Sequence, residues 1–190
     1  MVVGLGNPGP RYLRTRHNVG FMVASALLSR GRSGPDRVKD SALVAPAKIG
    51  AAEIAIVQPQ TFMNLSGTAV AALARRSGIE AAEILLVYDD ADLDVGLLRI
   101  RSSGSPAGHK GVASVVDCFG TRDVPRLRLG IGKDSGELAD RVLAPFSGAE
   151  WPVVEKMIEE ACDAVEMIVA RGLTAAMNQY NRRAQQPPGE

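Results

Sequence analysis

Two periods of apolar and polar residues run through this chain, and together they predict an α/β domain. Apolar residues at every third or fourth position predict helices, and short continuous or alternating apolar runs predict strands. The predicted helices begin near residues 19, 64 and 110 and cover 151–171 and 174–180. The predicted strands cover 1–3, 42–49, 52–58, 84–88, 97–101 and 126–131. We therefore expect an α/β fold: a single domain with a mixed, mostly parallel twisted sheet surrounded by helices.

Glycine and polar residues mark the ends of these elements. Gly78 and Gly120 should end two helices, and Asn64 or Ser66 is the expected N-cap of the first of them. Residues 30–40 are rich in Gly, Ser and Pro, which is typical of a flexible loop.

The 190 residues are enough for one well-buried core. We expect one domain over residues 1–183 and a disordered tail over 184–190. No terminal segment resembles a signal peptide and no apolar run approaches membrane-spanning length, so we expect a cytoplasmic protein without a membrane partner. The two cysteines, Cys118 and Cys162, lack C-x-x-C spacing and are expected to be reduced.

Charge is distributed in blocks that the overall net charge of +1 conceals. Residues 1–39 and 97–133 carry net charges of +6 and +5, while residues 40–96 and 134–190 carry −5 each. Both histidines lie in the basic blocks, which suggests an anionic ligand such as nucleic acid on one face. Alternation of charge for solubility explains the pattern equally well.

The loop between the first predicted strand and helix, Gly4–Gly20, is unusually rich in specific polar residues. Its start, GLGNPG, matches the glycine spacing of a dinucleotide-binding fingerprint. However, Pro8 removes a backbone donor, the helix begins too late to hold a pyrophosphate, and residues 22–30 contain no acid for a ribose. The pattern therefore argues against dinucleotide binding.

An acidic loop follows the buried strand 84–88, in the usual position for a site in an open α/β sheet. Asp90, Asp92 and Asp94 match the first part of a calcium loop. The required glycine and closing glutamate are not at their positions, so we predict no metal.

The chain has no G-x-S-x-G motif and no cysteine in an activating context. A neutral imidazole oriented by a carboxylate can take a proton from water, and side-chain amides can stabilise a developing oxyanion. The available groups suffice for hydrolysis of an activated acyl bond: His17, His109, Asp89, Asn7, Asn18 and Asn64. Spacing alone does not tell which histidine meets Asp89.

Six motifs, in this order, closely resemble those of the bacterial-type peptidyl-tRNA hydrolase family, and the resemblance extends to about Asn181. They are GLGNPG (4–9) with Tyr12, TRHN (15–18), QTFMNLSG (60–67), DDADL (89–93), GHKG (108–111) and RLRLGIG (126–132). The resemblance implies cleavage of the ester between a peptide and the 3′ end of tRNA, without a cofactor. It implies that His17 activates water, that Asp89 orients His17, and that Asn7 and Asn64 position the peptide and the attacked carbonyl.

The resemblance also implies residues that bind the substrate. Tyr12 and Met63 would line the cleft, and His109 would stand on the opposite wall and help bind the substrate beside Lys110. Further implied features are a phosphate clamp of Arg101 and Arg128 on the 5′ phosphate of tRNA and contact with the tRNA acceptor end. We also expect a monomer. Arginine suits such a clamp because its fork can bind phosphate at two places.

Three positions depart from the family pattern. Lys110 stands where many members have asparagine, Tyr88 where a histidine commonly precedes the acid, and residues 102–107 contain serine, proline and alanine where glycine is usual. We expect catalysis to survive, because His17 and Asp89 are retained.

Two alternatives stay open. One is a catalytically reduced RNA-binding protein on the same fold, similar to organellar splicing cofactors, which would bind RNA without cleaving the ester. The other is a dinucleotide-binding oxidoreductase, which a titration with NAD(P) would test.

Overall fold

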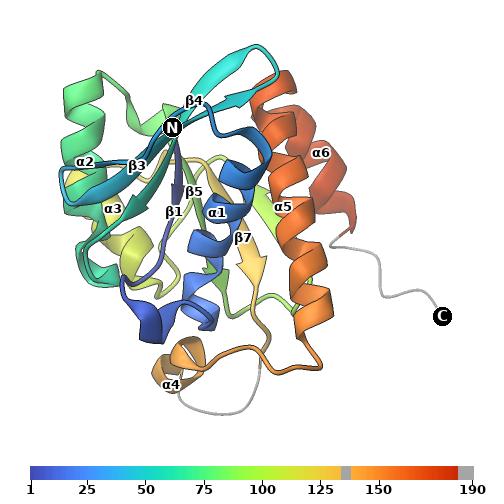
Figure 1. Cartoon of the computed structure of the whole chain (residues 1–190). Coiled ribbons are helices and arrows are strands. Elements are labelled where there is room, and N and C mark those ends of the chain that lie inside the picture. Colours follow the sequence, from blue (N-terminus) through green and yellow to red (C-terminus); the bar gives the residue numbers. More distant parts are fainter. Residues whose placement is uncertain (134–137, 184–190) are drawn as a thin grey trace.

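A seven-stranded mixed sheet organises the chain, which the computed structural model describes over residues 1–133 and 138–183 (Figure 1). The strands, in their order across the sheet, are β2 (Arg37–Lys39), β3 (Ala42–Ile49), β4 (Ala52–Pro59), β1 (Val2–Gly4), β5 (Leu85–Asp90), β7 (Arg126–Gly130) and β6 (Leu98–Arg101). The four strands β4, β1, β5 and β7 are parallel, and the outer pairings are antiparallel. The predicted single α/β domain with a mixed sheet is confirmed.

Helices cover both faces of this sheet (Figure 1). One face carries α1 (Val19–Gly31), α5 (Trp151–Arg171) and α6 (Leu173–Arg183), and the other carries α2 (Ser66–Ser77) and α3 (Lys110–Phe119). The alternation of side chains along β5 divides the core: Leu85 and Val87 pack toward α1 and α5, whereas Leu86 and Tyr88 pack toward α2 and α3. Short elements complete the chain: η1 (Pro10–Tyr12), η2 (Arg16–Asn18), η3 (Met63–Leu65), η4 (Ala81–Glu83) and α4 (Leu138–Leu143).

Two glycines of the Gly4–Gly20 stretch allow α1 to contact the sheet backbone directly. A Cβ atom on Gly4 would lie 2.3 Å from the Gly20 carbonyl oxygen, and one on Gly20 would lie 2.3 Å from the Val87 carbonyl oxygen. Any larger side chain would therefore force the elements apart. These glycines serve helix–sheet packing, and the packing brings η2, which contains His17, to the end of β5.

The structure corrects several details of the sequence prediction. The predicted loop 30–40 contains the short strand β2, whose exposed residues carry no apolar alternation. Neither Asn64 nor Ser66 is the N-cap of α2, because the turn η3 precedes this helix and leaves Leu65 at the cap position. Gly78 and Gly120 do end their helices in the left-handed conformation. The predicted disordered tail over 184–190 lies outside the described residues.

Candidate active site

A cleft of about 880 Å³ opens at the carboxyl ends of β1, β4 and β5. Nine of the ten predicted site residues line it: Asn7, Tyr12, His17, Met63, Asn64, Asp89, His109, Lys110 and Arg128. The tenth, Arg101, is exposed at the end of β6 and does not line the cleft. The fold thus brings most of the predicted site together from segments up to about 120 positions apart in the sequence.

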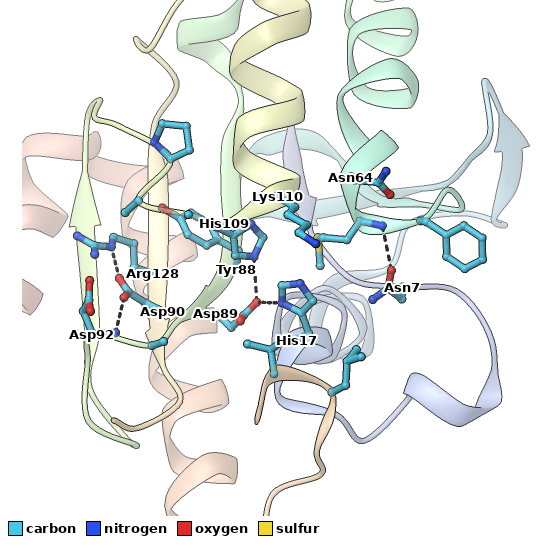
Figure 2. Close-up of a pocket in the computed structure, with 18 of the residues that line it drawn as sticks. Asn7, His17, Asn64, Tyr88, Asp89, Asp90, Asp92, His109, Lys110 and Arg128 are labelled. Carbon is cyan, nitrogen blue, oxygen red and sulfur yellow. Dashed lines mark hydrogen bonds and ion pairs between the residues drawn. The ribbon is translucent and has the colours of Figure 1, made fainter. Parts of the chain in front are cut away.

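Both histidines meet the same carboxylate oxygen (Figure 2). Asp89 Oδ1 lies 2.7 Å from Nδ1 of His17 and 3.0 Å from Nε2 of His109. The two imidazole rings are 4.9 Å apart between their centroids. The expectation that His109 stands on an opposite wall is therefore wrong, since its ring lies beside that of His17.

The backbone fixes the tautomer of His109. His109 caps α3, and its Nδ1 accepts a hydrogen bond from the N–H of Val112 at 3.2 Å. An Nδ1 that accepts must be unprotonated, so the proton of the neutral ring is on Nε2 and is donated to Asp89. A cationic His109 would place two donors against each other at Nδ1. The helix cap therefore favours the arrangement of His109 in which Nε2 carries the proton that faces Asp89.

Asp89 is buried and ionised. Burial by itself would raise its pKa, but the hydrogen bonds and charges of His109 and His17 outweigh burial and hold the pKa of Asp89 far below its usual range. An ionised Asp89 accepts the Nδ1 proton of His17, which leaves the lone pair of His17 on Nε2. His17 itself lines the cleft, so a basic nitrogen is available to a molecule bound there.

The side chains of His17, Asp89 and His109 also have the spacing of a metal-ligand set, with ligand atoms within 4.8 Å of one another. The hydrogen bonds argue against coordination. A metal on Nε2 of His109 would displace the proton that this nitrogen carries, and Nδ1 could then be protonated only by giving up the Val112 N–H. The arrangement fits a proton-transfer site better than a metal centre.

Asn7 is held in place by Asn18, a fully buried residue. The N–H of Asn7 donates to Asn18 Oδ1, and Asn18 Nδ2 donates to the carbonyl oxygen of Asn7, both at 2.9 Å. Asn7 Oδ1 in turn accepts the N–H of Met63 at 2.9 Å. Since Oδ1 is occupied, Asn7 presents its amide Nδ2 as a donor. Asn18, one of the candidate amide side chains, thus acts as a positioning residue for Asn7.

The wall beside Asn7 carries the remaining predicted substrate contacts. Met63 is buried against the start of α3, where a Cβ on Gly111 would lie 2.4 Å from its sulfur. Asn64 is exposed on η3, and Tyr12 stacks under the Arg11 guanidinium at the cleft edge. This wall therefore combines amide groups with apolar surface.

Arg128 forms an ion pair with Asp90, the residue after Asp89 (Figure 2). Neighbouring residues of a strand point to opposite faces, so β5 directs Asp89 to the histidines and Asp90 to Arg128. Asp90 also accepts the N–H of Asp92 at 2.9 Å, which fixes its carboxylate. This role of Asp90 was not predicted, although an acid next to a catalytic candidate is a visible signal in the sequence.

Arg126 shares a face of β7 with Arg128, and its side chain is buried, with 1% of the residue exposed. Its guanidinium donates to three backbone carbonyl oxygens, those of Val124, Ser105 and Arg122, at 3.0 to 3.2 Å. These bonds attach the loop 102–108 to the turn before β7. Arg126 thus anchors the loop that leads to His109 and does not serve as a free cation.

Tyr88 packs against His109, with ring centroids 4.7 Å apart. Burial raises the pKa of the Tyr88 hydroxyl, and the nearby Arg126 and Arg128 oppose that shift. A neutral tyrosine at this position supports the imidazole from β5 without adding charge.

The turn that carries His17 is attached to the start of α5. Buried Arg16 forms two charged contacts with Glu150, at 2.8 and 2.9 Å, and donates to the Ile131 carbonyl oxygen at 3.1 Å. Its guanidinium also lies over the ring of Phe146. Hydrogen bonds from Arg16 and Ser147 outweigh partial burial and lower the pKa of Glu150 to about 2.

Comparisons with known proteins agree with this geometry. A family model described as peptidyl-tRNA hydrolase matches residues 1–188. A peptidyl-tRNA hydrolase of Syntrophomonas wolfei subsp. wolfei is 45% identical over 95% of this chain and 99% of the relative, and one of Chloroflexus aggregans is 46% identical over 95% and 98%. The crystal structure of the Acinetobacter baumannii peptidyl-tRNA hydrolase superposes with a TM-score of 0.89 at 30% identity, covering 95% of this chain and 93% of that chain. Among the described helices, none has the length and apolar character needed to cross a membrane.

Proposed function

This chain belongs to the peptidyl-tRNA hydrolase family, and we propose that His17 is the general base with which it hydrolyses the ester between a peptide and the 3′ end of tRNA. The observation that carries this proposal is the hydrogen bond of 2.7 Å between His17 Nδ1 and Asp89 Oδ1. It leaves the Nε2 lone pair of His17 free to take a proton from water.

In the first step, water attacks the ester carbonyl carbon while its proton moves to His17 Nε2. The carbonyl π electrons become the negative charge of a tetrahedral oxyanion, and the ionised Asp89 stabilises the imidazolium that forms. The Nδ2 amide of Asn7 and the amide of Asn64 are the donors we assign to the oxyanion and the peptide. With these groups, attack of water on the ester needs neither a metal nor a covalent intermediate with the enzyme.

In the second step, the oxyanion collapses and breaks the bond between the carbonyl carbon and the 3′ oxygen of the tRNA. The departing oxygen takes the proton back from the His17 imidazolium, which regenerates the neutral base. The products are a peptide with a free carboxyl group and a tRNA with a free 3′ hydroxyl. His109 holds the Asp89 carboxylate through both steps.

We assign the binding of the tRNA 5′ phosphate to Arg128 and Arg101. Arg128 uses Nε in its ion pair with Asp90, so the two terminal nitrogens of its guanidinium are left for phosphate oxygens. Arg101 lies diagonally from Arg128, since it is opposite Arg126 in the pairing of β6 with β7. The acceptor end would enter between this pair and His17, and we place the reaction in the cytoplasm with a monomeric enzyme.

The test is release of labelled N-acetylated amino acid from N-acetyl-aminoacyl-tRNA by the native chain, by His17→Ala and by an EDTA-treated sample. We expect cleavage to persist in EDTA and to fall by about 10²- to 10⁴-fold in His17→Ala, while tRNA affinity stays nearly unchanged. Equal loss of binding and turnover in the variant would contradict the role of His17. A folded native protein that binds tRNA without cleaving it would favour the RNA-binding alternative.

A further inference from the structure

We propose that Lys110 determines specificity for N-blocked substrates by repelling the α-ammonium group of unblocked aminoacyl-tRNA. This inference rests on the proposed function. Peptidyl-tRNA and aminoacyl-tRNA share the same ester, and they differ next to it in one respect: a neutral amide in the first and an ammonium group in the second. A cation near that position separates the two classes by charge.

Lys110 lines the part of the cleft where we place the α-nitrogen of the substrate. It is the first residue of α3, directly after His109, and lines the cleft together with Asn7 and Asn64. The following residue, Gly111, packs against Met63. In Figure 2 the Lys110 side chain extends over the space between His17 and Asn7. The attacked carbonyl must lie within reach of His17, and the α-nitrogen is only two bonds from the carbonyl carbon.

Among the residues that the structure describes, no acid on this side of the cleft forms an ion pair with Lys110. The acidic residues that line the cleft are Asp89, Asp90 and Asp92. Asp89 is occupied by the two histidines, and Asp90 is paired with Arg128. Asp90 and Asp92 lie on the Arg128 side of His17 in Figure 2, away from Asn7 and Asn64. An ammonium group placed at Lys110 would meet a second cation, while the carboxylates of Asp89 and Asp90 are already taken by the histidines and by Arg128.

A lysine also suits the blocked substrate. Its ammonium group can donate to the carbonyl oxygen of the peptide's first amide, as the asparagine common in the family can. Lysine cannot accept a hydrogen bond, so it offers nothing to an α-ammonium group. The departure at position 110 therefore keeps a donor for the amide and adds a charge against the unblocked ester.

The experiment measures kcat/KM for N-acetyl-aminoacyl-tRNA and for the same aminoacyl-tRNA without the acetyl group, at pH 6.5 (about 1 unit or more below the α-amino pKa). The ratio of interest is kcat/KM for the N-acetyl substrate divided by kcat/KM for the unblocked one. Lys110→Asn and Lys110→Met should lower this ratio by about 10-fold, chiefly by raising cleavage of the unblocked ester. Lys110→Arg should keep the native ratio. In the native enzyme, cleavage of the unblocked ester should also rise as pH passes the α-amino pKa, after subtraction of spontaneous hydrolysis.

The matched control is Lys48→Asn, which removes an exposed lysine from β3 and should leave the ratio unchanged. A ratio that stays native in both Lys110→Asn and Lys110→Met would overturn the inference. Equal loss of cleavage of both substrates would also overturn it, because Lys110 would then act on the oxyanion. Failure of the native enzyme to cleave the N-acetyl substrate would instead reject the proposed function itself.

Discussion

His109 donates its Nε2 proton to Asp89 Oδ1, the same oxygen that accepts the Nδ1 proton of His17. The negative charge of one carboxylate is therefore shared by two imidazoles. His109 is a positioning residue in this arrangement, because it fixes the carboxylate and limits how strongly Asp89 attracts the proton of His17.

Replacing His109 by asparagine should remove its contact with Asp89 while keeping the cap of α3. The asparagine oxygen can still accept the Val112 N–H, but the side chain is too short to reach Asp89. We expect kcat for N-acetyl-aminoacyl-tRNA to fall by about 10-fold. The acid limb of its pH profile should move to higher pH, because Asp89, with one donor fewer, holds the His17 proton more strongly. Thermal unfolding should show the retained cap, and an unmoved pH profile would contradict the positioning role.

Asp89→Asn tests the orientation of His17. An asparagine amide can donate to Nδ1 of His17, which favours the tautomer with its proton on Nε2 and removes the base from the cleft. We expect kcat to fall by about 10²-fold or more with KM little changed. Steady-state kinetics at pH 7 and tRNA binding by the folded variant provide the measurement. A variant with native kcat would show that His17 needs no carboxylate.

Arg128→Ala should weaken tRNA binding about 10-fold and reduce the slope of log Kd against log salt by about 1, since one phosphate contact is lost. We expect the effect only with tRNA that carries a 5′ phosphate. Arg75→Ala, at the exposed end of α2, is the control and should leave the slope unchanged. If Arg128→Ala weakens both forms of tRNA equally, the clamp is assigned to the wrong residue.

Glu150→Gln should make stability less dependent on pH. The pKa of Glu150 is lowered to about 2 in the folded chain by Arg16, so its contribution is fully present above the unfolded value near 4.5 and is lost as pH falls through about 2. The free energy of unfolding should therefore be lower in the variant at pH 6, and the difference should shrink below pH 4. Denaturant unfolding across this range provides the test, and a difference that grows at low pH would contradict the assignment.

The sequence predicts elements and chemistry better than it predicts contacts. Periodicity located the helices and strands, and the left-handed residues Gly78 and Gly120 end helices where expected. The site residues followed from the resemblance. The sharing of Asp89 by two histidines was not predictable, because sequence separations of 72 and 20 residues do not determine how far apart the side chains lie in space.

The missed features have physical causes as well. The inward orientation of Arg126 depends on three carbonyl oxygens from two loops, which no local pattern reveals. The cap of α2 was misassigned because η3 inserts one turn of tighter helix before Ser66. The strand β2 forms only through pairing with β3, since its own residues are exposed and carry no apolar period.

The adjacent placement of Asp89 and Asp90 on β5 restricts how the chain can change in length. Inserting or deleting one residue before Asp89 within β5 would turn each aspartate to the other face. The histidines and Arg128 would then lose their carboxylates together, so one such event would abolish both the chemistry and the binding of tRNA. Length variation among descendants of this protein should accordingly be confined to its loops, while β5 accepts substitutions but no insertions.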